Sequence, residues 1–446
     1  MRISRYLLRQ ATTVLEQKLD HYSQFNPSPL SVKQFTDFGR TASKEASFQF
    51  LRQELPVRLA NIMKEFRLLP ENLTHMPSLV AVRDMYRQSF LELTQFEHDD
   101  DKDGFTEALI RIRDRHRDVV MMTAAGIMEL KEVANVNANT EANIQYFLDR
   151  FYMSRISIRM LINQHTLLFG SEVRDRGDHI GCIDPNCDIL RVVEDAYSNA
   201  RFLCDQYYMA CPELPQWWVL QYQYYMACPE LRVTVPYVPS HLYHMLFELF
   251  KNAMRAVVEH HTPEGDLPPV QVLLVKGRED LCIKLSDQGG GIPRSQMDLL
   301  FNYMYSTAPQ VPHATGGTHT PPLAGYGYGL PLSRLYARYF QGDLSLTSVD
   351  GYGTDALIYL KAISSEANEL LPVYNKTCQR QYSTPLQTND WSSQLHSSMF
   401  IRPFSTNTLH KMASGSACHH WKGLFATSGS SCGSGSTRDV HCEATA

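Results

Sequence analysis

Residues 239–255 read PSHLYHMLFELFKNAMR, and this stretch decides how the rest of the chain is interpreted. It predicts a helix with Ser240 as its N-cap, because apolar residues recur after Ser240 at helical spacing and would face a core. The opposite side carries polar residues at steps of three and four, which therefore share one face: His244, Glu248, Asn252, Arg255 and Glu259. A solvated helix surface has the same pattern, so this stretch alone leaves a catalytic and a purely structural interpretation open.

Glycine-containing motifs follow this helix. A strand over residues 281–285 leads into SDQGGGIP at 286–293, which sets the Asp287 carboxylate beside backbone that a flat ligand can approach closely. AGYGYGLPLSR at 324–334 places glycines before a helix, and such a start presents free amides and a positive dipole to phosphate. GYGTD at 351–355 precedes a further strand. Each motif alone is also compatible with an ordinary glycine-rich turn.

Taken in order, these elements resemble the ATP-binding fold shared by gyrase, Hsp90, histidine kinases and MutL. Within that superfamily the chain is similar to the mitochondrial pyruvate dehydrogenase kinases. The resemblance extends over roughly residues 15–375 and is carried by short motifs: FNPSPLS at 25–31, RFYMSRISIR at 150–159, DPNC at 184–187, MYSTAP at 304–309, the glycine motif at 324–334 and YFQGDL at 339–344.

The expected architecture is α + α/β. Segments of helical periodicity with short breaks extend to Phe169 and predict a helical bundle, one of them running unbroken from Thr106 to Leu130. Helices that then alternate with strands predict a two-layer sandwich. The resemblance further implies that residues 1–180 form a regulatory, lipoyl-domain-binding bundle and that residues 181–370 form a GHKL-type (Bergerat) α/β sandwich ATP-binding domain. Residues 371–446 are expected to form a carboxy-terminal arm and a disordered Ser/Gly-rich tail.

One nonapeptide occurs twice. QYYMACPEL at 206–214 returns at 223–231, whereas repeat architectures need about three or more units. The family pattern has a single copy, so residues 212–228 are interpreted as an insertion that forms a surface loop, with Trp217 and Trp218 exposed on it.

Composition excludes several classes of protein. The chain has 446 residues, 43% of them hydrophobic, and is long enough for two or three domains. Its net charge of -5 argues against a nucleic-acid binder, its ten scattered cysteines indicate reduced thiols, and no apolar run reaches the length of a membrane span, about 20 residues. Arg2, Arg5 and Arg9 fit a mitochondrial presequence and an ordinary first helix equally well. The resemblance implies the mitochondrial matrix.

Phosphoryl transfer depends on positioning the reactants and on neutralising charge. These two requirements suggest roles for the residues of the motifs quoted above. The resemblance implies that Asp287 anchors adenine with support from Thr354, that Asn252 binds Mg²⁺, and that Lys251 and Arg255 add positive charge near the phosphates. Glu248 then orients or deprotonates the substrate serine, and His244 is expected to hydrogen-bond Glu248 and tune its pKa. The remaining ATP-binding residues are expected to be Gly289, Gly291, Ser306, Thr307, Gly325, Tyr326, Gly327, Tyr328, Gly329 and Leu330. ATP and Mg²⁺ are the expected cofactors, and K⁺ is a further candidate.

Arginines are frequent on two helices of the bundle, where surface salt bridges are the default explanation. Arginines interleaved with isoleucines would also make a partly apolar pocket for a small carboxylate. The resemblance implies such an allosteric pocket for pyruvate and its analogues, lined by Tyr86, Ser89, Arg113, His116, Ser154, Arg155, Ile158 and Arg159.

The resemblance also implies an activity and partners. The expected enzyme is a protein serine kinase that phosphorylates and inactivates the E1 alpha subunit of the pyruvate dehydrogenase complex, which regulates glucose oxidation and acetyl-CoA formation. It is expected to bind the lipoyl domain of the E2 acetyltransferase and to form a homodimer, with Asp390 and Trp391 in a dimer arm. Gln288 stands where the family usually has Arg, and we expect little effect from this change.

Alternative functions remain at this point. A branched-chain ketoacid dehydrogenase kinase is the nearest one, although DPNC at 184–187 and YSTAP at 305–309 favour the pyruvate enzyme. A histidine-kinase-like ATPase would need a phosphoacceptor histidine; His165 is the nearest candidate, but a buried structural histidine explains it better. A non-enzymatic adaptor is disfavoured because Glu248, Asn252, Asp287 and the glycines are all present.

Overall fold

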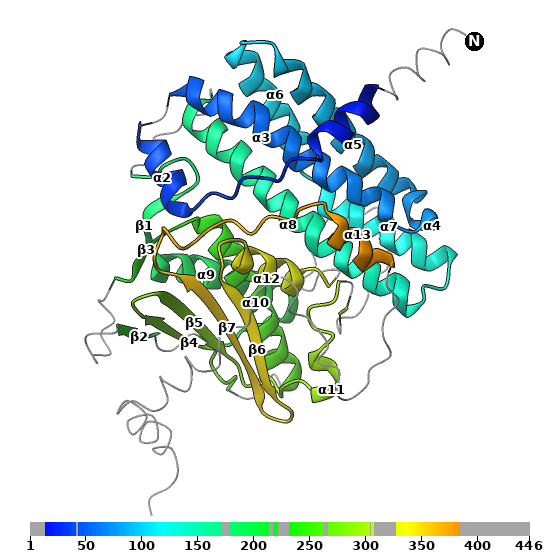
Figure 1. Ribbon diagram of the computed structural model, residues 1–446. Coiled ribbons are helices and arrows are strands. Elements are labelled where there is room, and N and C mark those ends of the chain that lie inside the picture. The colour runs from blue at the N-terminus through cyan, green and yellow to red at the C-terminus, as the bar shows by residue number, and fades with distance from the viewer. Residues whose placement is uncertain are drawn as a thin grey trace, which may run out of the picture. The chain divides into compact units, whose positions relative to one another are not determined.

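The computed structural model describes residues 14–41, 43–170, 178–213, 217–221, 232–261, 266–303, 305–306 and 327–383. Its first part is helical (Figure 1). After a helix over residues 14–22, the elements are α2 (Val32–Thr41), α3 (Lys44–Glu65), η1 (Phe66–Leu68), α4 (Glu71–Thr74), α5 (Pro77–Leu93), η2 (Thr94–Glu97), α6 (Lys102–Arg115), α7 (Val119–Val133) and α8 (Ala138–Phe169). No helix in these described ranges is both long enough and apolar enough to cross a bilayer.

The bundle is built around α8, which Asn137 caps by accepting a hydrogen bond from the Thr140 amide. Aromatic side chains pack its centre: the rings of Phe147 and Phe151 stack with centroids 5.4 Å apart, and Phe66 meets both edge-on. The expected single helix from Thr106 to Leu130 is wrong, since α6 ends at Arg115 and α7 begins at Val119. The chain breaks there because the side chain of the C-cap residue His116 turns into the core, where it stacks on Tyr86.

The second part alternates strands and helices. Its elements are β1 (Asp184–Asp188), α9 (Ile189–Tyr208), β2 (Trp217–Gln221), β3 (Thr234–Tyr237), α10 (Pro239–His260), β4 (Gln271–Lys276), β5 (Asp280–Ser286), α11 (Arg294–Met297), α12 (Gly329–Tyr339), β6 (Asp343–Val349), β7 (Gly353–Lys361) and α13 (Lys376–Ser383). β1 and β3 pair as a small antiparallel sheet beside the start of α9.

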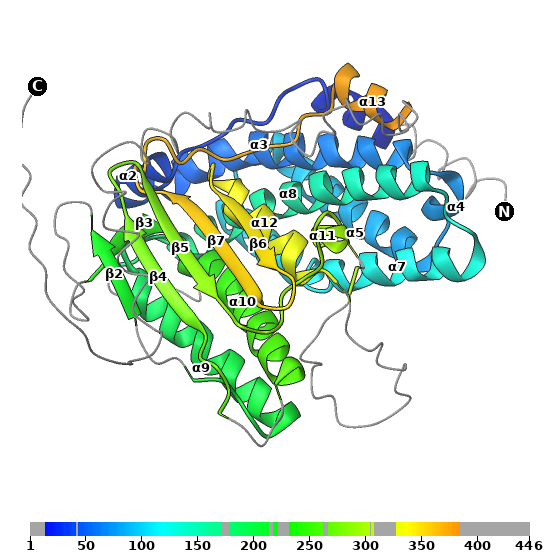
Figure 2. The ribbon, with the colours of Figure 1, turned by 90° about the horizontal axis from the view of Figure 1, so that it is seen from below.

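The main sheet has the order β2-β4-β5-β7-β6, with β2 parallel to β4 and the other pairs antiparallel. Burial alternates along β5, because one face of the sheet packs on helices. Figure 2 shows α9, α10 and α12 on that face. Together with the bundle, this two-layer arrangement confirms the predicted α + α/β fold.

Some local predictions were wrong. Ser240 does not cap α10: the helix begins one residue earlier at Pro239, whose fixed φ suits a first helical position, and its N-cap Val238 makes no side-chain bond. The stretch expected to be a surface loop contains β2, which pairs with the edge of β4 and so satisfies backbone groups that the edge would otherwise expose. The side chains of Trp217 and Trp218 lie outside the described part, and their exposure stays a prediction.

A buried ion-pair network joins the two parts of the fold. Arg58 in α3 is 2% exposed and donates to Glu54 and Glu369 at 2.8 Å each and to the Ser28 carbonyl at 3.0 Å. Glu369 lies in the segment after β7 and also accepts the hydroxyl of Tyr339 in α12. Because a buried charge needs its partners, this network, here called the Arg58 network, fixes α3 against α12.

Candidate active site

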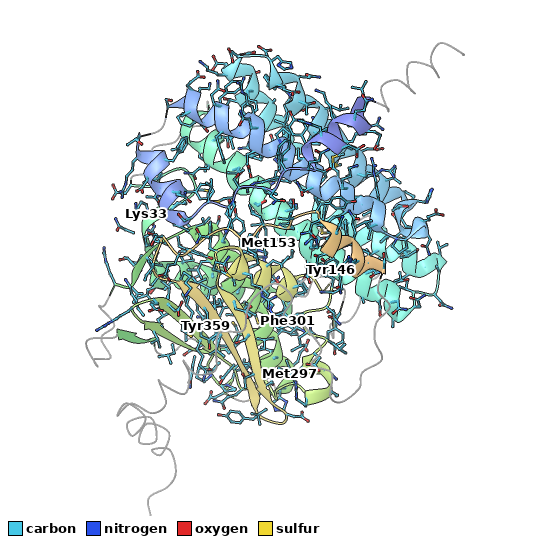
Figure 3. The ribbon with its side chains drawn as sticks, in the orientation of Figure 1. Lys33, Tyr146, Met153, Met297, Phe301 and Tyr359 are labelled. Carbon is cyan, nitrogen blue, oxygen red and sulfur yellow. The ribbon has the colours of Figure 1, made fainter. Side chains whose placement is uncertain are left out.

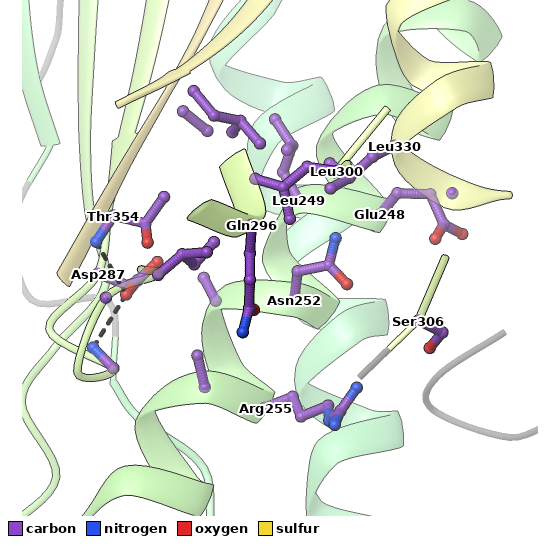
Figure 4. A pocket seen from close by; sticks show the side chains of 18 of the residues that line it. Glu248, Leu249, Asn252, Arg255, Asp287, Gln296, Leu300, Ser306, Leu330 and Thr354 are labelled. Carbon is purple, nitrogen blue, oxygen red and sulfur yellow. Dashed lines mark hydrogen bonds between the residues drawn. The ribbon is translucent and has the colours of Figure 1, made fainter. Parts of the chain in front are cut away.

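A pocket of about 440 Å³ opens beside α10 and contains most of the described residues predicted for ATP (Figure 4). Its lining includes α10, the ends of β5 and β7, α11 and the start of α12. The predicted residues that line it are Glu248, Asn252, Arg255, Asp287, Gly289, Gly291, Ser306, Gly327, Gly329, Leu330 and Thr354. Of the remaining predicted residues, Thr307, Gly325 and Tyr326 lie outside the described part of the chain.

Asp287 directly follows β5 at the floor of the pocket. Its Oδ1 accepts the amides of Gly289 at 2.9 Å and Thr354 at 3.3 Å, the two bonds dashed in Figure 4. These bonds leave Oδ2 for a ligand. The carboxyl is 9% exposed, and burial raises its pKa to about 6. Close approach of the backbone is required here, because a Cβ on Gly353 would lie 2.0 Å from the Asp287 carbonyl oxygen.

Glu248 lies where α10 meets the start of α12. Its Oε1 is 2.8 Å from Nζ of Lys251. A Cβ on Gly329 would come within 2.3 Å of Oε2, so only glycine at this position lets the carboxylate reach the helix start. Lys251 is buried, with Nζ 5.1 Å from the centre of the Phe247 ring, and is absent from the lining of the described pocket.

Asn252 and Arg255 continue along the same face of α10 (Figure 4). The Asn252 side chain is exposed to the pocket and makes no hydrogen bond within the described residues. Arg255 donates from Nε to Glu259 at 2.8 Å. The amide oxygen of Asn252 therefore remains available to a hard cation, which fits the predicted Mg²⁺ ligand.

His244 does not behave as expected. Its Nε2 is buried without a hydrogen-bond partner, and its ring lies 4.9 Å from that of Tyr336 in α12. Burial lowers the pKa of His244, so the imidazole is neutral. The predicted hydrogen bond to Glu248 is not present among the described contacts: Glu248 pairs with Lys251, and the His244 ring packs against Tyr336.

Two residues of the pocket were not predicted from the sequence. Gln296 and Tyr305 line it, and the Tyr305 hydroxyl donates to Gln296 Oε1 at 3.2 Å. Tyr305 stood in a quoted motif next to Ser306, which was a usable signal. Tyr328, which was predicted to bind ATP, is instead buried with its ring 5.2 Å from Tyr303 and is not in the lining.

The bundle brings the second predicted set of residues together. The rings of Tyr86 and His116 stack with centroids 4.5 Å apart, and Ser89 Oγ lies 2.9 Å from His116 Nε2. Ser154 and Ile158 are buried on α8. The Tyr86 hydroxyl is buried without a partner, which leaves a polar group that a ligand could satisfy.

Two arginines of α8 border this cluster. Arg155 donates from Nη2 to the His116 carbonyl at 2.8 Å, while its Nε is buried without a partner. Arg159 donates to the Arg113 carbonyl at 3.4 Å, and burial and then the charge of Arg155 lower its pKa. Neither arginine has a carboxylate partner among the described residues, which the salt-bridge explanation would require. Burial and then Arg155 lower the pKa of His116 to about 3.

Comparison with known proteins places this geometry in a family. A family model described as mitochondrial branched-chain alpha-ketoacid dehydrogenase kinase matches residues 29–184, and one described as histidine kinase-, DNA gyrase B-, and HSP90-like ATPase matches residues 237–363. The chain is 58% identical over 389 residues to the mitochondrial pyruvate dehydrogenase (acetyl-transferring) kinase of Drosophila melanogaster, covering 85% of this chain and 93% of that protein. The chain belongs to the mitochondrial pyruvate dehydrogenase kinase family.

Other members of the family are similarly close. Human pyruvate dehydrogenase kinase isozyme 1 is 54% identical over 383 residues, with 84% of this chain and 86% of that protein covered. The kinase of Ascaris suum is 52% identical over 399 residues, with 89% and 98% covered. The family places the pocket of Asp287 and Glu248 in an ATP-dependent kinase, as predicted.

The structure also answers the histidine-kinase alternative. His165 is buried in α8, with Nδ1 2.7 Å from Ser47 Oγ and Nε2 3.0 Å from Thr106 Oγ1. Burial lowers its pKa to about 4. Both ring nitrogens are thus engaged inside the bundle, and the prediction of a structural histidine is confirmed.

Proposed function

We propose that this chain is a mitochondrial matrix protein serine kinase that uses ATP to phosphorylate, and so inactivate, the E1 alpha subunit of the pyruvate dehydrogenase complex. The observation that carries the proposal is the position of Glu248. Its carboxylate touches the glycine at the start of α12 in a pocket that Asp287 anchors from the other side. A candidate base thus lies at the phosphate-binding end of a nucleotide-sized cavity.

The pocket residues divide the work by their chemistry. Asp287 accepts from the exocyclic amine of adenine through Oδ2, and Thr354 supports the carboxylate through its amide. Amides of Gly327, Gly329 and Leu330 face the phosphates at the start of α12. Asn252 would hold Mg²⁺, which supplies charge neutralisation to the transferring phosphate.

Glu248 then acts on the substrate serine. It orients the hydroxyl and accepts its proton as the phosphoryl group transfers. The Lys251 ammonium holds Oε1 and leaves Oε2 at the glycine start of α12. His244, neutral and one turn earlier, packs against Tyr336 and thereby supports the helix face rather than bonding the base.

Transfer of radiolabel from ATP tests the substrate. Purified pyruvate dehydrogenase E1 and branched-chain ketoacid dehydrogenase E1 are offered in parallel at equal concentration. We expect label on a serine of the pyruvate E1 alpha subunit and loss of its activity. Label confined to the branched-chain E1 would assign the other substrate, and label only on the kinase, or none despite ATP binding, would overturn the serine-kinase proposal.

Nucleotide affinity is expected to fall as the pH drops through 6. The pKa of Asp287 is raised to about 6, so the ionised acceptor is complete above that pH and is lost below it. The dissociation constant of ADP, measured by fluorescence titration from pH 5 to 8, should rise up to about tenfold per pH unit below 6. The Asp287→Asn side chain is a neutral acceptor at every pH. The phosphates of ADP titrate in the same way with this variant as with the wild type. An identical pH profile in this variant would contradict the assigned role.

We further propose that the cluster of Tyr86, His116, Arg155 and Arg159 binds pyruvate and similar small carboxylates as inhibitors. Arg155 and Arg159 have no carboxylate partners in the described chain. The Tyr86 hydroxyl and Nε of Arg155 are buried without hydrogen-bond partners, so an anion would satisfy several groups at once. Arg113, Ser89, Ser154 and Ile158 are proposed as the remaining residues of this site; Arg113 accepts Arg159 through its carbonyl, and Ser89, Ser154 and Ile158 are buried.

Arg159→Met is expected to weaken inhibition by pyruvate about tenfold or more, since a charge-assisted hydrogen bond is lost. Stability should not fall, because the change also removes repulsion with Arg155. Initial rates at several pyruvate concentrations give the inhibition constant. Arg83→Met removes an exposed arginine of α5 and should leave it unchanged. Equal inhibition of both variants would place the carboxylate site elsewhere.

The proposal includes the assembly expected from the sequence. The bundle, residues 1–180, would bind the lipoyl domain of E2, and residues 181–370 would form the kinase domain and the homodimer contact. The dimer arm with Asp390 and Trp391 lies outside the described residues.

A further inference from the structure

Side chains on one face of α8 contact the segment that leads into the nucleotide pocket. Gln145, Asp149 and Tyr152 follow at steps of four and three, so they share a face of this helix. The segment that they meet begins at Phe301, labelled in Figure 3. None of these side chains lines the pocket itself, and the mechanism above does not use them.

The contacts of this face are specific. Gln145 holds the backbone of the segment at two points: its Nε2 donates to the Phe301 carbonyl at 3.1 Å, and its Oε1 accepts the Tyr303 amide at 3.0 Å. Asp149 accepts the Tyr303 hydroxyl at 3.0 Å. A side-chain amide that donates to and accepts from the same backbone segment fixes both the position and the orientation of that segment.

The held segment continues directly into the pocket wall. Leu300 lies in the lining just before Phe301, and Tyr305 and Ser306 lie in it just after Tyr303. The Tyr303 ring also packs 5.2 Å from that of Tyr328, which precedes the lining residue Gly329. Tyr303 and Tyr328 both contact α8, because the centre of the Tyr152 ring lies 5.5 Å from that of Tyr303 and 6.0 Å from that of Tyr328.

We propose that Gln145 and Asp149 are positioning residues for the nucleotide: by holding residues 301–303 they place Leu300, Tyr305 and Ser306 in the pocket wall, so that the bundle helps to set the affinity for ATP and ADP. This proposal rests on the nucleotide role of the pocket proposed above. Coupling between sites is reciprocal, so bound nucleotide must in turn stabilise the contacts on α8.

The test compares Gln145→Ala with Asn143→Ala. Asn143 lies two residues earlier on α8 and donates to the Tyr382 carbonyl in α13 at 3.2 Å, so its loss removes a comparable bond that is remote from the pocket wall. In Gln145→Ala, which loses two hydrogen bonds, the KM for ATP and the dissociation constant of ADP should each rise about tenfold, with kcat within about twofold. Asn143→Ala should match the wild type in all three.

A second comparison isolates the hydroxyl bond. Tyr303→Phe and Asp149→Ala should each weaken ADP binding. The double variant should bind ADP no more weakly than the single variant with the lower affinity, because both substitutions remove the same hydrogen bond. Asp149→Asn, which retains an acceptor, should recover most of the affinity. Additive losses would show that the two side chains act separately and would overturn this part of the proposal.

Hydrogen exchange supplies a readout that a merely structural role would not move. ADP should slow amide exchange over residues 141–152 in the wild type and not in Gln145→Ala. A Gln145→Ala protein that loses thermal stability but keeps wild-type ADP affinity would overturn the inference. If the wild-type chain itself bound no ADP, the failure would belong to the proposed function.

Discussion

Glu248→Gln should lower transfer of phosphate to E1 by about 10²- to 10⁴-fold while ADP affinity changes little. Gln has the shape of Glu, so the close approach to Gly329 is kept, but the amide cannot take a proton from the serine hydroxyl. Asp287, which we propose as the adenine anchor, lies on the far side of the pocket, and its contacts are not altered. Single-turnover transfer from labelled ATP, with ADP binding measured on the same protein, separates the two effects.

Glu194→Gln is the matched control, because it removes an exposed carboxylate from α9 and should leave transfer at the wild-type rate. If Glu248→Gln lost ADP binding in proportion to activity, the carboxylate would be a binding group instead of a base. Transfer at an undiminished rate would require a base from outside the described pocket.

Arg58→Met should lower the free energy of unfolding by about 3–5 kcal/mol, the cost of leaving buried carboxylates without their cation. Glu54 and Glu369 both point at this guanidinium, and Glu369 is fully buried. Met fills a similar volume, so loss of charge and not a cavity dominates the change. Urea denaturation followed by circular dichroism near neutral pH gives the value.

Two further variants sharpen this result. Arg52→Met, on the same helix, breaks a pair with the exposed Asp100 and should cost less than about 1 kcal/mol. Arg58→Met combined with Glu369→Gln should recover part of the loss, since one orphaned charge is gone. A single variant as stable as the wild type would mean that the carboxylates find protons or other partners, and that the Arg58 network does not fix the two parts together.

Local patterns predicted much of this structure because the features concerned are local. A helix was expected over residues 239–255 and is found there as part of α10, since its apolar residues recur at the helical period within one segment. The strand that leads into Asp287 and the glycines before α12 were recognisable because their backbone geometry limits which residues fit.

The errors arose where a distant residue decides the outcome. β2 was read as part of a loop because its pairing partner, β4, lies more than 50 residues further on, and no local pattern encodes that pairing. His244 and Glu248 are correctly spaced for a bond, yet Glu248 pairs with Lys251 and the His244 ring packs against Tyr336 in α12, a residue distant in the sequence. The hydrogen bonds of Gln145 to Phe301 and Tyr303 join residues more than 150 positions apart, and no local sequence pattern indicates them.

The Arg58 network also sets an order for biosynthesis. Arg58 and Glu369 are separated by 311 residues, so the helices that leave the ribosome first wait for a carboxylate that is made much later. Until then the guanidinium has only Glu54 in its own helix, and the bundle carries an incompletely paired charge in its interior. The bundle therefore completes this buried ion pair only after residue 369 has been made, and a chain truncated before residue 369 should depend on chaperones more than its helical sequence implies.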